Sequence, residues 1–225
     1  MLKVRNLSKK FYIHILNEKV IDGFDTVNFS IDEGRSLGIS GPSGAGKSSI
    51  MKCIYRRYIP STGDIYYESN QFGNVNLSDA SENIILKIRE NEIGYITQFL
   101  RVIPRVPCVD VVAEPLLASG VNINEAREKA GDILNRLGIP LKLFEAYPST
   151  FSGGEQQRVN IAKAIIRKQR LLMVDEPTAS LDRKAISIVL DIFNELKKSG
   201  TTMIGIFHDK EVLSEFSDEI FNLEA

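Results

Sequence analysis

The chain has 225 residues, which is enough for one domain with a full hydrophobic core and a smaller attached lobe. Hydrophobic residues make up 43% of it and charged residues 25%, and these ordinary values exclude disordered and fibrous classes. With 28 basic and 29 acidic residues the net charge is −1, so composition gives no support to a nucleic-acid-binding protein.

Cysteine usage and apolar runs bear on the cellular compartment. Cys53 and Cys108 lack metal-ligand spacing and cannot form a disulfide framework, which is typical of reduced thiols in a cytosolic protein. No apolar run approaches the ~20 residues needed to cross a bilayer. We therefore expect a cytoplasmic protein that binds no nucleic acid and does not itself insert into a membrane.

The N-terminal part of the chain reads as strands and turns. Apolar and polar residues alternate over 27–31, and a short apolar strand at 36–40 leads into a glycine-rich loop. The pattern then predicts a helix at 48–57, short strands within 61–77 and a buried strand at 93–97.

From about 109 to 168 the pattern is helical, with an amphipathic segment at 125–137 that ends at Gly138. Apolar strands return at 171–174 and 202–206, with a one-faced helix between them. Strands that alternate with helices in this way predict an α/β fold around a parallel sheet.

The loop after the strand at 36–40 matches the phosphate-binding pattern Gly-x-x-x-x-Gly-Lys-Ser, and a helix is expected to follow it. Its glycines let backbone N–H groups surround phosphates, and the helix N-terminus adds partial positive charge. Lys47 would contact the β- and γ-phosphates of ATP, and Ser48 would hold Mg²⁺. The candidate nucleotide-binding residues of this segment are Gly41, Pro42, Ser43, Gly44, Ala45, Gly46, Lys47, Ser48 and Ser49.

Four polar residues follow apolar strands and complete the predicted chemistry. Asp175 ends the strand at 171–174 and suits Mg²⁺ coordination, while Glu176 would polarise the attacking water as general base. His208 would contact the γ-phosphate, and the amide of Gln98 can reach Mg²⁺ or water, so Gln98 belongs to both the catalytic and the metal set. Each residue alone is a weak signal, but with the loop they predict an ATPase that uses ATP and Mg²⁺.

The order of these motifs, with Ser152-Gly153-Gly154-Glu155-Gln156 ahead of Asp175, resembles the ATP-binding-cassette (ABC) ATPase family along the whole chain. The resemblance implies a P-loop NTPase of the ABC ATPase type, with a mainly parallel core sheet, an antiparallel β lobe and an inserted helical lobe. It implies one domain over 1–225: residues 1–98 and 169–225 form the nucleotide-binding core with the β lobe, and residues 99–168 form the helical lobe with the signature motif.

The family resemblance also implies a head-to-tail dimer that holds two ATP molecules between its subunits. Each ATP would lie between the glycine loop of one chain and Ser152, Gly153 and Gly154 of the other. A serine and two glycines that open a helix form a backbone N–H nest suited to a γ-phosphate. Asp182 resembles the aspartate that links the two sites across the dimer. The second chain would be another copy or a paralogous ABC ATPase.

Two positions carry open questions. Phe11 resembles the aromatic residue that stacks on adenine, with Tyr12 as the near alternative. Glu155 stands where the family usually has glutamine. Its carboxylate suits a helix N-terminus but would repel a γ-phosphate, so we expect it to point away from the nucleotide.

Three segments, 98–105, 147–162 and 205–209, are similar to the L-subunit subfamily of the bacterial phosphonate carbon–phosphorus lyase systems. This implies a soluble ABC ATPase that works with the lyase core complex in phosphonate catabolism, where the subfamily is linked to synthesis of ribose 1-methylphosphonate 5-triphosphate. The segment after Gln98 carries two arginines, apolar residues and a proline, which favours docking on protein.

Two other readings remain open. The chain could be the ATP-binding subunit of a membrane transporter of the lipoprotein- or peptide-exporter type, in which case its partner is a membrane permease and it lies peripherally at the membrane. It could also be a non-catalytic clamp that dimerises on ATP, although intact Glu176 and His208 speak against a clamp.

Overall fold

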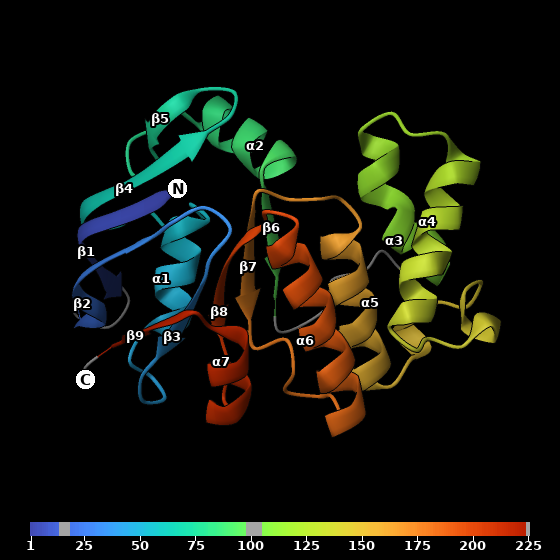
Figure 1. Cartoon of the computed structure of the whole chain (residues 1–225). Helices are drawn as coiled ribbons and strands as arrows, with labels where there is room; N and C mark the ends of the chain where they lie inside the picture. Colours follow the sequence, from blue (N-terminus) through green and yellow to red (C-terminus); the bar gives the residue numbers. More distant parts are fainter. Residues whose placement is uncertain (14–18, 98–104, 224–225) are drawn as a thin grey trace.

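The computed structural model describes residues 1–13, 19–97 and 105–223, which build two β-sheets and the helices around them (Figure 1). One sheet has the strand order β6-β7-β8-β3-β9, and every neighbouring pair in it is parallel. Its strands are β3 (Ser36–Ser40), β6 (Ile93–Ile96), β7 (Leu171–Asp175), β8 (Thr202–Ile206) and β9 (Glu219–Asn222). This arrangement confirms the α/β fold with a parallel sheet predicted from the sequence.

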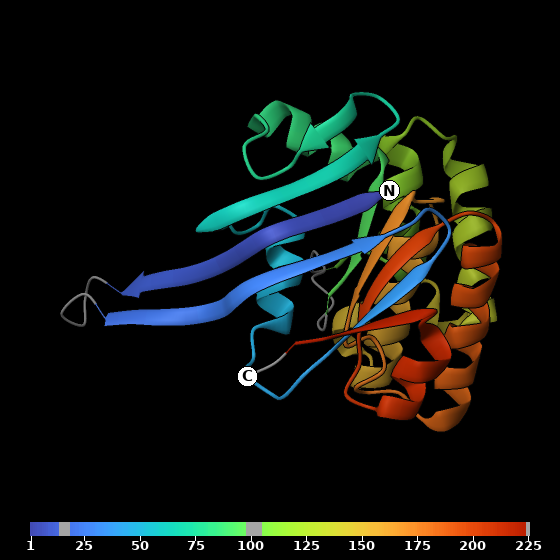
Figure 2. The same ribbon diagram turned by 60° about the vertical axis from the view of Figure 1, so that its left-hand side comes forward.

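The second sheet is antiparallel and has the order β2-β1-β4-β5. Figure 2 shows its two longest strands extending together beyond the rest of the molecule. These are β1 (Leu2–Ile13) and β2 (Lys19–Ile31), while β4 (Thr62–Ser69) and β5 (Gly73–Asn76) complete the sheet. In β1, Phe11 pairs with Ile21, and this register brings the aromatic residue level with the start of β2.

The helices lie around and beside the parallel sheet (Figure 1). They are α1 (Lys47–Ile54), α2 (Glu82–Asn91), α3 (Cys108–Ala118), α4 (Ile123–Arg136), α5 (Gly153–Ile165), α6 (Arg183–Lys198) and α7 (Lys210–Phe216), with short 3₁₀ turns η2 (Leu141–Leu143) and η3 (Pro148–Thr150). Helix α3 packs on α4 and α5, so the three helices between β6 and β7 form one group.

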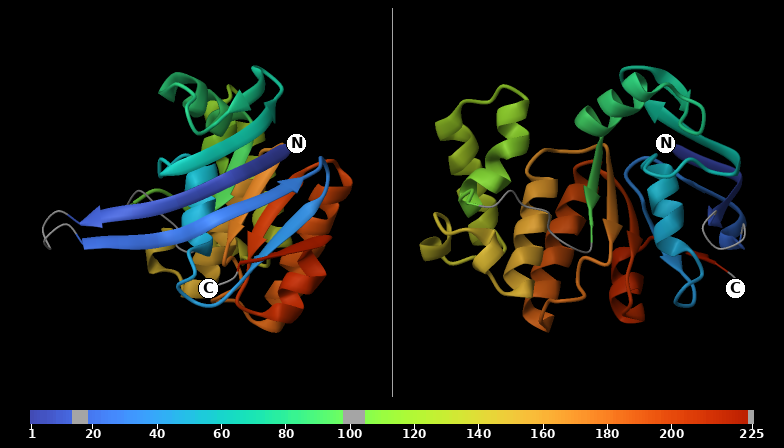
Figure 3. Two further views of the ribbon diagram at one scale, coloured as in Figure 1. Left: turned by 90° about the vertical axis from the view of Figure 1, so that its left-hand side faces the viewer. Right: turned by 180° about the vertical axis from the view of Figure 1, so that it is seen from behind.

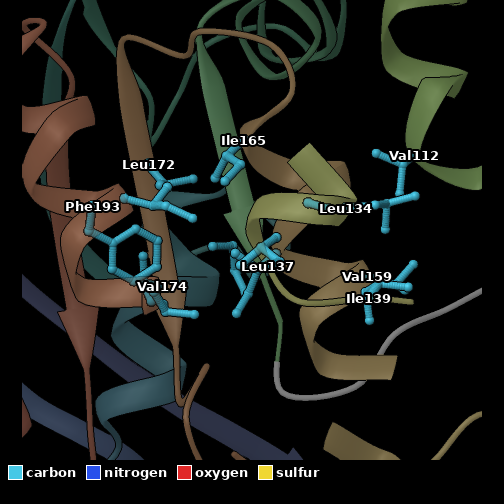
Figure 4. Packing of buried hydrophobic residues seen from close by; sticks show 14 of the residues in the cluster. Val112, Leu134, Leu137, Ile139, Val159, Ile165, Leu172, Val174 and Phe193 are labelled. Atoms are coloured by element: carbon cyan, nitrogen blue, oxygen red, sulfur yellow. The ribbon is translucent and has the colours of Figure 1, made fainter. Parts of the chain in front are cut away.

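The parallel sheet separates two hydrophobic cores. Along β7, Leu172 and Val174 belong to the core that also holds Phe193 of α6 (Figure 4). Leu171 and Met173 belong to the other core, with residues of α1 and the antiparallel sheet. Because successive side chains of a strand point to opposite faces, a strand between two cores must be apolar throughout. This explains the continuous apolar run that predicts β7, whose five residues are all buried.

Three helices depart from the sequence expectation. Helix α1 ends at Ile54 rather than at 57, and Arg56 then adopts a left-handed φ of 61°. Helices α2 and α7 were not predicted. For α2 a signal was present, because Ser81 stands at its N-cap and Ile85 and Ile88 are buried on one face. The boundaries proposed for the helical lobe stay a prediction, since residues 98–104 lie outside the described part of the chain.

Candidate active site

The phosphate-binding loop connects β3 to α1, as its motif predicts. Gly46 is the N-cap of α1 and has a φ of 95°, a left-handed conformation that favours glycine. A Cβ atom at Gly46 would lie 1.8 Å from the carbonyl oxygen of Gly23 in β2. The loop therefore packs against β2 so closely at Gly46 that only glycine fits there.

We predict that Gly46→Ala weakens ATP binding by about a hundredfold or more, since the loop must move away from Gly23 and lose the positions of its N–H groups. Gly44→Ala is the matched control. Gly44 has a φ of 83°, but a Cβ there meets nothing within 4 Å. The Gly44→Ala variant should therefore lose less ATP affinity, because only backbone strain in the loop opposes binding. Isothermal titration with ATP measures both, and equal affinities of the two variants would contradict this explanation.

Lys47 folds back over its own loop. Its ammonium group donates hydrogen bonds to the carbonyl oxygens of Gly41 and Pro42, both at 2.8 Å. No acidic residue lies in the first turn of α1. The loop thus presents a lysine and a helix N-terminus without a competing carboxylate, which is the electrostatic arrangement that an anion requires.

Ser48 and Asp175 meet although they are far apart in the sequence. The Ser48 hydroxyl donates to Asp175 Oδ1 at 3.0 Å, and the Tyr95 hydroxyl donates to Asp175 Oδ2 at 3.1 Å. Asp175 is buried, with 7% of its surface exposed. Burial, and then the Asp175 charge, raise the pKa of Tyr95, so its hydroxyl stays a donor. Sequence reasoning missed Tyr95, because a tyrosine in a buried strand carries no signal for this contact.

Glu176 and His208 also lie side by side. His208 Nε2 lies 3.0 Å from Glu176 Oε1, and Glu176 has a left-handed φ of 52°. The Glu176 N–H donates to the carbonyl oxygen of Ile206 at 3.0 Å, which ties the residue to β8. A non-glycine residue in this conformation persists only where its surroundings hold it, and such positions cluster at functional sites.

Glu176 and His208 line a cavity of about 420 Å³ together with Lys47 and Ser48, whereas Asp175 is not among its described walls. Its walls include Phe11, Gly23, Lys47, Glu176 and His208. Phe11 makes an edge-to-face contact with Tyr58, with ring centroids 5.2 Å apart, whereas Tyr12 is 61% exposed and is absent from the described walls of the cavity. The structure thus brings Phe11 to the loop and leaves Tyr12 in solvent.

If Phe11 stacks on adenine, Phe11→Ala should weaken ATP binding about tenfold, the usual scale for losing one base–aromatic stack. Tyr12→Ala should leave the affinity near that of the parent protein. Fluorescence titration with a ribose-labelled ATP analogue measures both constants. A larger loss in the Tyr12 variant would reverse the assignment.

The signature residues Ser152, Gly153 and Gly154 are not among the described walls of the 420 Å³ cavity. Ser152 is the N-cap of α5 and forms a capping box: its hydroxyl oxygen accepts from the Glu155 N–H, and its own N–H donates to the Glu155 carboxylate. A Cβ at Gly154 would lie 2.8 Å from the carbonyl oxygen of Ser180. Asp182 caps α6 and accepts from the Ala185 N–H at 2.8 Å.

Glu155 has a local role that its position at a helix start explains. Besides accepting from the Ser152 N–H, its carboxylate accepts a hydrogen bond from the Ser152 hydroxyl at 2.7 Å. These bonds lower the pKa of Glu155, so the carboxylate stays ionised at the positive end of α5. Gln98, expected as a catalytic and metal residue, lies outside the described residues.

A sequence model of the family described as ABC transporter matches residues 24–179 of the chain, more than half of its length. The chain belongs to the ABC transporter family. It is therefore an ABC ATPase subunit, and this family hydrolyses ATP. The family and the ATPase activity expected from the sequence are both confirmed.

Relatives of this ABC ATPase include two bacterial proteins named for ATP binding. The uncharacterized ABC transporter ATP-binding protein YknY of Bacillus subtilis is 31% identical over 212 residues, 94% of this chain and 88% of the relative. The glutamine transport ATP-binding protein GlnQ of Geobacillus stearothermophilus is 34% identical over 212 residues, 93% of this chain and 84% of the relative. These names concern transport and give no support to a phosphonate role.

A solved structure of an ABC cassette matches this ABC ATPase over its whole length. It is a dimeric post-hydrolysis state of the ATP-binding cassette MJ0796 with ADP and Pi, at a TM-score of 0.89 and 28% identity. The match covers 100% of this chain and 96% of that one. It confirms the expected fold.

The residues present fit Mg²⁺ bound together with a nucleotide. Ser48 and Asp175 offer an alcohol and a buried carboxylate in contact, and no group of three or more histidine, cysteine, aspartate or glutamate residues able to hold a metal occurs in the described ranges. Mg²⁺ at nucleotide sites takes most of its ligands from phosphates and water, so a sparse protein set suits it. In the described parts of this ABC ATPase no helix is both long and apolar enough to cross a membrane.

Proposed function

We propose that this chain is one half of a head-to-tail dimer that binds and hydrolyses ATP with Mg²⁺, and that it serves the phosphonate carbon–phosphorus lyase system as a PhnL-type subunit. In this proposal the chain forms a single domain, made of a nucleotide-binding core and a helical lobe, and it works in the cytoplasm. The observation that carries the ATPase mechanism is the cavity that joins Lys47, Glu176 and His208.

Each residue has a separate task in this proposal. When bound, Mg²⁺ with ATP supplies an electrophilic γ-phosphate. Lys47 and the loop N–H groups bind the phosphates, while Ser48 and Asp175 hold the metal. Glu176 accepts the proton of the attacking water, and His208, whose Nε2 lies 3.0 Å from Glu176 Oε1, contacts the γ-phosphate.

The second half of each site would come from a partner chain. Ser152, Gly153 and Gly154 lie outside the described walls of the cavity that holds Lys47, so they are free to serve the nucleotide of another chain. Solved ABC cassettes with a TM-score of 0.89 to this chain are dimers, which supports the same arrangement. A copy of this chain or a paralogue could take the partner's place.

The phosphonate role depends on the sequence similarity at 98–105, 147–162 and 205–209. The second segment covers η3 and most of α5, and the third runs from β8 to Asp209 beside the nucleotide cavity. The alternative is a transporter subunit bound to a membrane permease. The name of the glutamine transport relative favours that alternative.

A growth experiment separates the two roles. The chromosomal gene is replaced by a Lys47→Ala variant, and growth is compared with methylphosphonate or inorganic phosphate as the only phosphorus source. Loss of growth on methylphosphonate alone supports the lyase role. Unchanged growth on methylphosphonate contradicts it, and co-purification of the tagged parent protein with a membrane permease would then favour the transporter role.

A further inference from the structure

A second cavity shares Ser48 with the 420 Å³ cavity. It has a volume of about 730 Å³ and opens between α1 and α5, across the edge strand β6. Figure 3 shows this side of the molecule in its right-hand view, with β6 between the two helices. Ser48 lines both cavities, yet the loop residues Gly44 and Gly46 line only the smaller one.

The walls of the second cavity are strongly basic. They carry five cationic and two acidic side chains, an excess of three positive charges in a chain whose net charge is −1. The cations come from α1, α2, α5 and the turns after α1 and α5: Lys52, Arg57, Arg89, Lys163 and Arg167. One of the acids, Asp175, already accepts hydrogen bonds from Ser48 and Tyr95.

These cations are only partly satisfied within the chain. Lys163 pairs with Glu114, and Arg89 donates to the carbonyl oxygen of Tyr55 at 2.7 Å while its guanidinium lies 4.6 Å from that ring's centroid. Arg57 and Arg167 have no carboxylate within 4.0 Å among the described residues. The cavity therefore holds two guanidinium groups ready to pair with an anion.

The grouping of the cations is unfavourable without an anion. Burial is the main cause that lowers the pKa of Arg89, and the charges of Arg56 and Arg57 lower it further. Like charges held together in a partly enclosed space repel each other more than at an open surface. An anion among them would remove this repulsion and gain charge-assisted hydrogen bonds.

We infer that this cavity binds a small molecule with two or more phosphate or phosphonate groups, at a site that adjoins the ATP site at Ser48 and Asp175 but does not include the phosphate-binding glycines Gly44 and Gly46. The volume is within the range of small-molecule pockets, about 300–1,000 Å³. Cations spread over several elements suit several anionic groups rather than one. The half-buried faces of Tyr55 and Tyr58 provide contact for the rest of the ligand.

Inorganic tripolyphosphate is a suitable probe, titrated calorimetrically at fixed ionic strength. The ATP site is disabled in the Lys47→Ala variant and is occupied in the parent protein saturated with ADP. We expect tripolyphosphate to bind the basic cavity of both proteins with similar affinity. Arg167→Gln should weaken this binding at least about tenfold, the scale of one charge-assisted hydrogen bond.

The matched control is Lys168→Gln, which removes the same charge from the next, exposed residue that is not among the walls of the cavity. It should leave the affinity unchanged. Thermal melting checks that both variants fold. Three results overturn the inference: loss of all tripolyphosphate binding in Lys47→Ala, absence of binding to the ADP-saturated parent, or equal affinities of the Arg167 and Lys168 variants.

Discussion

Replacing Glu176 by glutamine should slow ATP hydrolysis about a hundredfold or more and leave ATP binding intact. Glutamine keeps the shape of the side chain and its contact with His208, but it cannot accept a proton from water. The measurement is phosphate release under saturating ATP, together with the ATP dissociation constant of the variant.

The control for this variant is Asp209→Asn, which removes a carboxylate one residue beyond His208. Asp209 caps α7 through the N–H groups of Glu211 and Val212, and asparagine caps helices equally well. Asp209 is not among the described walls of the cavity, so hydrolysis should stay near the parent rate. Near-normal hydrolysis by Glu176→Gln would remove Glu176 from the role of general base.

The second large effect concerns association. In the Glu176→Gln background, Ser152→Arg should abolish the ATP-driven dimer seen by size-exclusion chromatography, while the ATP affinity of the monomer stays unchanged. The change destroys the capping box and places a bulky cation at the already positive N-terminus of α5, where the partner's γ-phosphate is expected.

Ser199→Arg provides the comparison for this association test. Ser199 is the exposed C-cap of α6, at the opposite end of that helix from Asp182 and about 24 Å from it by the length of 16 helical residues. This variant should dimerise on ATP like its parent. A dimer that persists in Ser152→Arg would contradict the head-to-tail arrangement.

The phosphate-binding loop, β7 and β8 could be predicted because their signals are local. A glycine-lysine-serine loop between strand and helix, and apolar runs in strands buried on both faces, each follow from a few consecutive residues. Ser48 and Asp175 could each be assigned to Mg²⁺ from local signals, the loop motif and the end of an apolar strand, and the structure then places the two side chains in contact.

Other features depend on tertiary packing and had no such signal. The seat of Gly46 against Gly23 and the bond from Tyr95 to Asp175 join segments that only the folded sheet brings together. The basic cavity is a further example, because its cations lie between positions 52 and 167 without a fixed spacing.

Glu155 is different, because a local sequence signal for its role is present. Serine followed three residues later by glutamate is the pattern of a capping box. The bonds between the Glu155 carboxylate and Ser152 explain why glutamate is accommodated at this helix start.

The most direct test of the split site mixes two inactive variants, Lys47→Ala and Ser152→Arg. In a mixed dimer, the intact loop of the Ser152 variant faces the intact signature of the Lys47 variant, and the introduced arginine faces the site without Lys47. Each mixed dimer then carries one complete site of two, which neither variant can form with its own copies. We therefore predict that mixing restores hydrolysis, although neither variant is active alone. A mixture as inactive as its components would contradict a site shared between two chains.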